Sequence, residues 1–247
     1  MKRGLSHVCA ALTVISCAGT ETGNPVVSKS ISLHVHSSRP DVVAVSSTTQ
    51  GTVIDEAWVA FGNFAFLRSG QCGHIDSFMH EGPAVIVADL AGSKLHIEVP
   101  VEPRAYCGIV APLENANTAL PKGAPAALRD HSIVVLGHRA DGVAFTLAYP
   151  QLDELELVPP SDPSFLVRSD GPPLLLVFDA ATWMEGLDLG RATLATDGSI
   201  LVDETNNLAL LLSFENHIDC SLDLYSDADR SGDLSSDDPL VARCAPN

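Results

Sequence analysis

A segment near the C-terminus carries oxygen-bearing side chains at the alternate positions that bind calcium in EF-hand-type loops. Residues 227–238 (DADRSGDLSSDD) have the twelve-residue length of such a loop, with glycine at the sixth position. Calcium takes about six to eight oxygen ligands, and glycine permits the sharp turn that brings them around one point. The expected ligands are the side chains of Asp227, Asp229, Ser231 and Asp238 and the backbone carbonyl of Asp233. The pattern predicts Ca²⁺ as a cofactor.

Two departures from the usual loop predict weak binding. Asp238 closes the loop where EF-hands carry glutamate, which resembles the dockerin version, and the fifth position is serine. Weak sites of about 10⁻⁴–10⁻³ M are still filled outside the cell. Residues 206–218 predict an entering helix, but only residues 239–244 remain for an exiting segment, so we expect a single, truncated EF-hand. The alternative is a solvated acidic loop under a disulfide.

Other polar clusters predict chemistry less directly. His34 and His36 share one face of a predicted strand and would bind zinc only with a third ligand. The aromatic residues Trp58, Tyr106 and Trp183 suit a glycan platform or, more simply, core packing. The sequence lacks a Gly-x-Ser-x-Gly elbow, a phosphate-binding glycine loop and a His-Glu-x-x-His motif. We expect a non-enzymatic protein, with a glycan- or peptide-binding module and an extracellular hydrolase as alternatives.

The elements that would position these residues are mostly short strands. Alternating or β-branched runs separated by glycine and proline predict a mainly β sandwich or barrel. Asp141-Gly142 predicts a hairpin turn, and Gly62-Asn63 predicts a bulge or turn. The predicted strands are residues 31–36, 52–67, 84–90, 94–101, 106–113, 132–138, 143–149, 154–158 and 174–178.

Two helical segments are expected. Residues 180–186 predict one turn presenting Trp183 and Met184. Residues 206–218 predict a helix, although Leu222 and Leu224 just beyond it can alternate as a strand. The apolar face of this helix is expected to contain Leu208, Leu211, Leu212 and Ile218.

The cysteines are consistent with an oxidising compartment. Of six cysteines, Cys9 and Cys17 lie in the N-terminal segment, which leaves four in the expected folded part. Four cysteines allow three connectivities, and pairing neighbours closes the smallest loops. A zinc site is the weaker alternative, because the sequence has no Cys-x-x-Cys pair. The expected disulfides are Cys72–Cys107 and Cys220–Cys244.

The N-terminus has the pattern of a lipoprotein signal. Lys2 and Arg3 precede a short apolar stretch that ends in Val-Ile-Ser-Cys at residues 14–17, the order of a lipobox. Acylation of Cys17 would anchor the chain in a membrane, since each buried methylene contributes about 0.8 kcal/mol. The alternatives are an ordinary secretory signal and an uncleaved apolar segment. We expect residues 1–16 to be removed and residues 17–30 to form the lipidated tether.

Two stretches resemble known groups of proteins. Residues 17–25 (CAGTETGNP) resemble the start of predicted lipoproteins of myxobacterial type, whose function is unknown. That resemblance implies a bacterial envelope location, and Ala18 after the cysteine implies the outer membrane. Residues 89–113 resemble the centre of a domain of unknown function in bacterial lipoproteins, which implies an immunoglobulin- or transthyretin-like sandwich.

Composition limits the partners. The chain of 247 residues has a formal net charge of −17, with 14 basic and 31 acidic residues. We therefore expect no nucleic-acid partner, because binding to a phosphate backbone requires a basic surface. The expected partners are a membrane, through the lipid anchor, and a surface protein or glycan. We expect residues 31–200 to form the sandwich, and residues 201–247 to form a C-terminal helix and loop packed on it. A role in surface structure or adhesion is the expected function.

Overall fold

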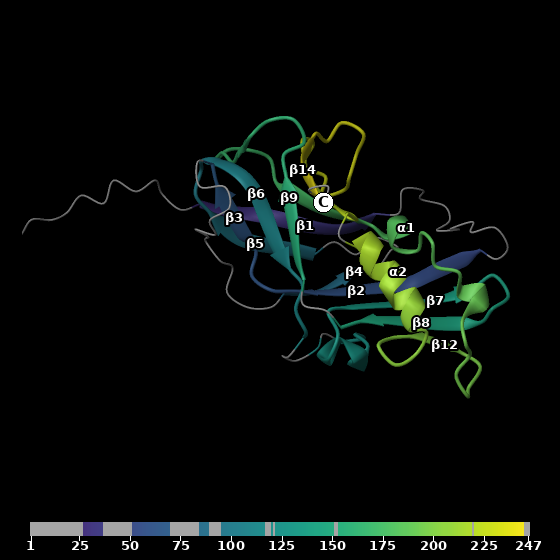
Figure 1. Ribbon diagram of the computed structural model, residues 1–247. Helices are drawn as coiled ribbons and strands as arrows, with labels where there is room; N and C mark the ends of the chain where they lie inside the picture. The colour runs from purple at the N-terminus through teal and green to yellow at the C-terminus, as the bar shows by residue number, and fades with distance from the viewer. Residues whose placement is uncertain are drawn as a thin grey trace, which may run out of the picture.

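The computed structural model contains two β-sheets with helical segments beside them (Figure 1). It describes residues 27–36, 51–69, 84–88, 95–116, 120, 122–150, 153–218 and 220–244. This part of the chain is mainly β, as the sequence predicts, and its two facing sheets are consistent with a sandwich. No helix among the described residues is long and apolar enough to cross a membrane.

The larger sheet has nine strands among the described residues. They are β1 (Val27–His36), β3 (Ala65–Arg68), β5 (Leu95–Val101), β6 (Ala105–Pro112), β9 (Glu154–Val158), β10 (Phe165–Leu166), β11 (Leu174–Asp179), β13 (Leu222–Ser226) and β14 (Leu240–Cys244). Their order is β10-β6-β9-β14-β13-β11-β1-β5, and β3 pairs with β6. Neighbours are antiparallel except β1 and β11, which run parallel.

The smaller sheet has five strands in the described part of the chain. They are β2 (Thr52–Phe61), β4 (Ala84–Ala88), β7 (Ile133–Arg139), β8 (Ala144–Tyr149) and β12 (Ile200–Val202). Their order is β12-β8-β7-β2-β4, with β12 parallel to β8. The hairpin predicted at Asp141-Gly142 joins β7 to β8, and Gly142 has a φ of 84° that favours glycine.

The chain crosses from the smaller sheet to the larger one at the turn predicted at Gly62-Asn63. Strand β2 ends at Phe61 and β3 begins at Ala65, in the other sheet. A Cβ atom at residue 62 would lie 2.3 Å from Oε1 of Glu114, so a larger residue here would displace the Glu114 side chain. The predicted strand 52–67 is therefore two strands in two sheets.

One hydrophobic core joins the sheets and the helices. Phe61 of β2 stacks on Phe178 of β11, with 5.6 Å between ring centroids. The contacts continue through Trp183 of α1 (Ala180–Trp183) and Phe214 of α2 (Leu208–Ile218) to Tyr149 of β8, at 5.3, 6.0 and 5.5 Å. Edge-to-face pairs at such distances contribute about 0.5–1.5 kcal/mol each beyond their buried area. The two sheets are thus held together partly by a chain of aromatic rings.

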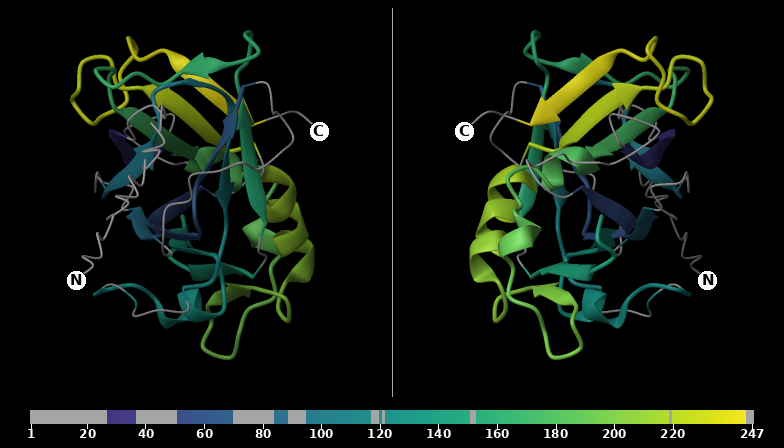
Figure 2. Two further views of the ribbon diagram at one scale, coloured as in Figure 1. Left: turned by 90° about the vertical axis from the view of Figure 1, so that its left-hand side faces the viewer. Right: turned by 90° about the vertical axis from the view of Figure 1, so that its right-hand side faces the viewer.

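Helix α2 lies at one side of the molecule, between the two sheets (Figures 1 and 2). Its buried side chains are Leu211, Phe214 and Ile218. The predicted apolar face is wrong in part, because Leu208 and Leu212 are 49% and 50% exposed. Phe214 faces the core in their place, since the steps 211, 214 and 218 follow the helical repeat.

The outer face of the smaller sheet is also covered. The 3₁₀ helix η1 (Ala126–Arg129) places Leu128 against Trp58 of β2 and Val134 of β7 in a second apolar cluster. Residues 58–61 are therefore all buried. They do not show the alternation of buried and exposed side chains that is typical of a strand with one solvent-exposed face. A second 3₁₀ helix, η2 (Leu189–Arg191), packs Leu189 into the main core.

The C-terminal segment is part of the larger sheet. Strands β13 and β14 lie between β11 and β9, well inside the strand order. Leu222 and Leu224 alternate as a strand with their side chains buried, which decides between the two readings of this stretch. The sequence did not predict strand β14, because residues 240–244 (LVARC) do not alternate clearly between apolar and polar side chains. In the structure, Ala242 is the one residue of this strand that is fully buried.

Candidate metal site

The predicted calcium-binding segment is the loop that joins β13 to β14, two adjacent strands of the larger sheet. The expected entering helix is wrong: α2 ends at Ile218, and β13 lies between it and the loop. The cause is the alternation of Leu222 and Leu224, which pairs this stretch with β11 and buries both leucines. The loop is flanked by strands on both sides and is not an EF-hand unit.

A disulfide joins the two strands beyond the loop. Cys220 precedes β13 and Cys244 ends β14, and their Cα atoms are 5.0 Å apart. The predicted Cys220–Cys244 pair is confirmed. Cys107 is also disulfide-bonded, and its predicted partner Cys72 lies outside the described residues, as does the predicted lipidation site Cys17. The base of the loop is thus closed both by strand pairing and by a covalent bond.

Asp227, at the first position, organises the loop from within. Its side chain is 1% exposed, and its two oxygens accept hydrogen bonds from the backbone amides of Ser231 at 3.0 Å and Gly232 at 2.9 Å. Gly232 has a φ of 73°, the left-handed conformation that glycine adopts without strain. The chain therefore folds back around this carboxylate.

Asp238, at the closing position, is held in the same way. It is 7% exposed, and its oxygens accept hydrogen bonds from the amides of Ala228 at 2.8 Å and Ser235 at 2.7 Å. A buried carboxylate costs several kcal/mol unless it is hydrogen-bonded or paired, and backbone amides stabilise its charged form. The first and last acidic residues are thereby fixed at the centre of the loop.

Asp229 completes a three-carboxylate cluster. Oxygens of Asp227, Asp229 and Asp238 lie within 4.8 Å of one another. Asp229 is exposed, and hydrogen bonding from Ser231 lowers its pKa, so the carboxylate is ionised at neutral pH. Like charges this close repel one another, and a cation bound between them would relieve the repulsion.

The remaining predicted ligands lie next to this cluster along the loop. The hydroxyl of Ser231 donates to the carbonyl of Asp233 at 3.0 Å, so these two oxygens share one neighbourhood. Asp237 is exposed and does not belong to the cluster. An oxygen-only donor set suits a hard cation such as calcium or magnesium rather than zinc or copper.

The aromatic candidates from the sequence do not form a binding platform in the described structure. Trp58, Tyr106 and Trp183 are 4%, 1% and 0% exposed, so they are core residues and no aromatic platform for glycan. His34 and His36 lie in β1, at positions paired with Val177 and Asp179 of β11; their side chains lie outside the described part of the structure.

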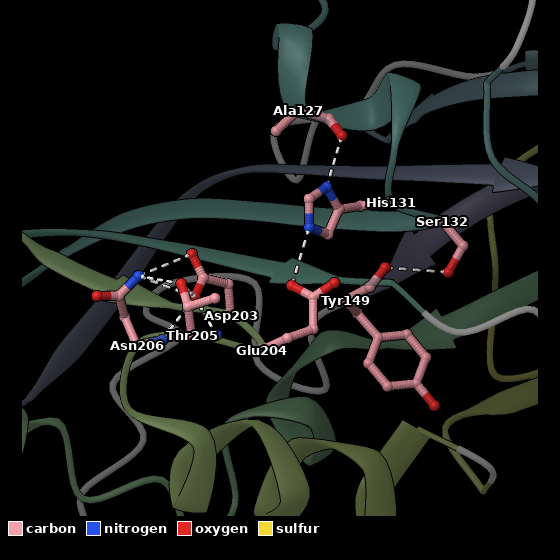
Figure 3. Close-up of polar contacts among 8 residues, drawn as sticks. All are labelled: Ala127, His131, Ser132, Tyr149, Asp203, Glu204, Thr205 and Asn206. Carbon is pink, nitrogen blue, oxygen red and sulfur yellow. Dashed lines mark hydrogen bonds and ion pairs between the residues drawn. The ribbon is translucent and has the colours of Figure 1, made fainter.

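A histidine–carboxylate contact that the sequence did not suggest joins η1 to the segment before α2 (Figure 3). One ring nitrogen of His131 lies 2.8 Å from the carbonyl of Ala127, and the other lies 3.4 Å from Glu204. The neighbouring Ser132 directs its buried hydroxyl to the carbonyl of Tyr149 and not to the histidine (Figure 3). The arrangement ties two segments together and lacks the serine–histidine hydrogen bond of an activated nucleophile.

Comparison with protein-family models, with curated proteins and with solved structures finds no match for this chain.

Proposed function

We propose that this protein is a non-enzymatic, lipid-anchored bacterial envelope protein whose β13–β14 loop binds calcium as a structural element. The observation that carries the calcium proposal is the convergence of Asp227, Asp229 and Asp238 within 4.8 Å, at the positions expected of calcium ligands. The anchor rests on the basic N-terminus and the lipobox ending at Cys17. A role in surface structure or adhesion follows from the combination of anchor, disulfides and calcium.

A structural role fits the loop better than a sensing role. Calcium sensors respond by swinging one helix against another, whereas this loop connects two paired strands closed by a disulfide. Calcium bound here would stabilise the folded state by mass action, by about 1.4 kcal/mol at a tenfold excess over Kd. The loop would then resist opening in the extracellular space.

Calorimetric titration of the full chain with calcium tests the site. We expect one saturable site with a Kd of about 10⁻⁴–10⁻³ M. Asp229→Asn removes a cluster carboxylate from an exposed position, so it should weaken binding about tenfold without unfolding the loop. Asp237→Asn makes the same charge change outside the cluster and serves as the matched control. Equal effects of the two variants, or no binding up to 10 mM (about tenfold above the expected range), would overturn the calcium proposal.

The anchor is tested separately. Expressed in a Gram-negative host, the chain should be acylated and should fractionate with the membrane. Cys17→Ala should abolish both the lipid label and the membrane association, while Cys9→Ala should leave both unchanged. A Cys17→Ala protein that still partitions with membrane lipid would contradict lipidation at this residue.

The finer type of sandwich is part of the same proposal. The resemblance of residues 89–113 implies an immunoglobulin- or transthyretin-like arrangement. Two mostly antiparallel sheets around a shared core support it. A crystal structure with a different order of strands from either family would refute it.

A further inference from the structure

A pocket lies at the end of the larger sheet where β11 begins and β13 ends. Its volume is about 560 Å³, within the range of about 300–1,000 Å³ typical of small-molecule sites. One wall is the segment after β9, which includes β10, and the other wall is formed by β14. Leu166 on this rim is 57% exposed, so apolar surface faces the opening.

The buried side chain of Lys29, in β1, is the group in this pocket that could bind a charged ligand. Lys29 lines the pocket and is 6% exposed, the only lysine among the buried polar residues in the described part of the chain. Its ammonium donates to the carbonyl of Gly171 at 3.3 Å. No carboxylate of the described residues lies within ion-pair distance of it. An ammonium has three N–H donors, so two of them are left for a ligand.

Lys29 is the one buried charged side chain among the described residues that line the pocket, and it would attract an anion. Burial lowers the pKa of Lys29; the carboxylate of Asp170 opposes this, and the guanidinium of Arg230 adds to it. Arg168 lines the same pocket from an exposed position. Asp162 also lines the pocket from an exposed position, so the ammonium of Lys29 is the one charge in its inner part among the described lining residues.

The walls favour an apolar body behind the anionic group. The hydrophobic lining includes Phe165, Leu166, Leu240 and Val241, all partly exposed. An apolar ligand would cover these side chains, and each square ångström removed from water contributes about 25 cal/mol. The Coulomb attraction between a carboxylate and a buried ammonium is stronger than in water, because the effective dielectric constant is lower there.

The geometry points to a binding site for a small organic carboxylate, with its carboxylate on Lys29 and its apolar body against Phe165, Leu166 and β14. This site is independent of the calcium proposal, although Arg230 belongs to the calcium loop and donates to the carbonyl of Asp170 beside the pocket. A carboxylate accepts the two free donors of the ammonium, and the neutral amide of the same acid cannot replace its charge.

The test is an NMR titration of the ¹⁵N-labelled full chain with octanoate and with 4-phenylbutyrate, each beside its neutral amide. Ligands of about ten to twelve heavy atoms should bind with a Kd on the order of 1 mM, and the amides at least about tenfold more weakly. Amide signals of residues 165–171 should shift first. No binding of either acid up to 10 mM (about tenfold above the expected Kd), or equal binding of acid and amide, would overturn the inference.

Two variants and one control locate the ammonium. Lys29→Met keeps the length and apolar stem of the side chain, and it should weaken binding of the acids about tenfold or more, because a charged hydrogen-bond partner is lost. Lys122→Met changes an exposed lysine outside the pocket and should leave the Kd unchanged. Leu166→Asp places a negative charge at the exposed rim, where folding tolerates it, and should also weaken binding. Unchanged affinity in Lys29→Met would overturn the inference, and unchanged affinity in Leu166→Asp would contradict the apolar wall at Leu166.

Discussion

The carboxylate of Asp227 accepts a hydrogen bond from the amide of Gly232, five residues later, at 2.9 Å. This contact folds the loop around a buried acidic side chain, and Gly232 supplies the left-handed turn that allows it. Both groups are buried, so the protein's own hydrogen bonds hold the turn without a cation. Hydrogen bonds from backbone amides therefore set the shape of the loop. The exposed Asp229 adds the third carboxylate beside Asp227 and Asp238.

Replacing Gly232 with alanine should weaken calcium binding. A φ of 73° costs an alanine about 1–2 kcal/mol, and relaxing that strain would move the amide away from Asp227. Gly198→Ala is the matched control, since Gly198 has a φ of 84° and open space around its Cβ position, far from the loop in sequence. Chemical unfolding should show a loss for both variants, larger for Gly232→Ala because the buried Asp227 loses a donor, whereas calorimetry should show a weaker calcium site in Gly232→Ala only. Equal calcium affinities in the two variants would count against the turn as the cause.

Removing the Cys220–Cys244 disulfide should destabilise the protein and loosen the loop. The bond spans 24 residues, and the loop-entropy model assigns about 3 kcal/mol to a closure of that size. The double variant Cys220→Ala/Cys244→Ala should therefore unfold at a lower urea concentration than the parent protein. Because β13 and β14 remain paired, calcium binding should weaken but persist.

The single variant Cys107→Ala is a comparison for the disulfide experiment, since it removes a bonded cysteine outside the loop. It should lower stability and leave the calcium affinity unchanged. If the double variant binds calcium as tightly as the parent protein, the disulfide has no part in shaping the loop.

Asn207 should be critical for the start of α2. Its φ is 52°, and its side chain accepts from the amide of Thr193 at 2.7 Å and donates to the carbonyls of Thr193 and Leu201 at 3.0 and 2.8 Å. Asn207→Ala loses these hydrogen bonds and strains the backbone, which should cost on the order of 2–4 kcal/mol of unfolding free energy.

Asn207→Gly separates the two effects at this position, because glycine accepts the positive φ and loses only the side chain. Its unfolding free energy should fall between those of the parent protein and Asn207→Ala. An alanine variant that unfolds within 0.5 kcal/mol of the parent, roughly the limit for surface substitutions, would show that the contacts at Asn207 are dispensable.

The stability of the Lys29→Met variant should depend on pH differently from that of the parent protein. Burial lowers the pKa of Lys29 below its value in the unfolded chain, against the opposing carboxylate of Asp170 and with the help of Arg230. As pH rises through the folded-state pKa, the folded protein releases this proton first, so the parent protein gains stability up to the unfolded-state pKa.

At pH 7 the methionine variant should therefore be as stable as the parent or more stable, because a buried ammonium is replaced by an apolar group of similar length. The difference in unfolding free energy between this variant and the parent protein should become smaller when urea unfolding is measured at increasing pH between pH 7 and pH 10. Lys122→Met should show no such convergence, since Lys122 is exposed. An advantage that widens with pH would contradict the sign of the pKa shift at Lys29.

Local patterns were sufficient for most of the strands. The predicted strand at 154–158 coincides with β9, because Leu155 and Leu157 face the core while Glu154 and Glu156 face solvent. Asp141-Gly142 located the β7–β8 turn for a similar reason: the required positive φ is a property of the glycine itself. Such features depend on one residue and its neighbours, and they are readable from the sequence.

Features that depend on distant partners were missed or misjudged. Strand β14 has weak alternation and exists because β13 and β9 supply hydrogen-bond partners on both sides. Leu212 fits an apolar helix face, yet Phe214 is the residue that meets Trp183 and Tyr149. The rotation of a helix about its axis is set by what it packs against, and its own sequence leaves more than one choice open.

The sequence by itself determined the mainly β class and the acidic loop with its glycine, because each follows from residue type and spacing within a short stretch. It favoured the pairing of Cys220 with Cys244 but left two other connectivities open. Only the tertiary structure decided that strands flank the loop, that Asp227, Asp229 and Asp238 converge while Asp237 does not, and that Lys29 is buried in a pocket. Lys29 is 142 residues away from Gly171, the carbonyl to which it donates. Such proximity arises from the order in which strands join a sheet, and no local pattern of residues contains that order.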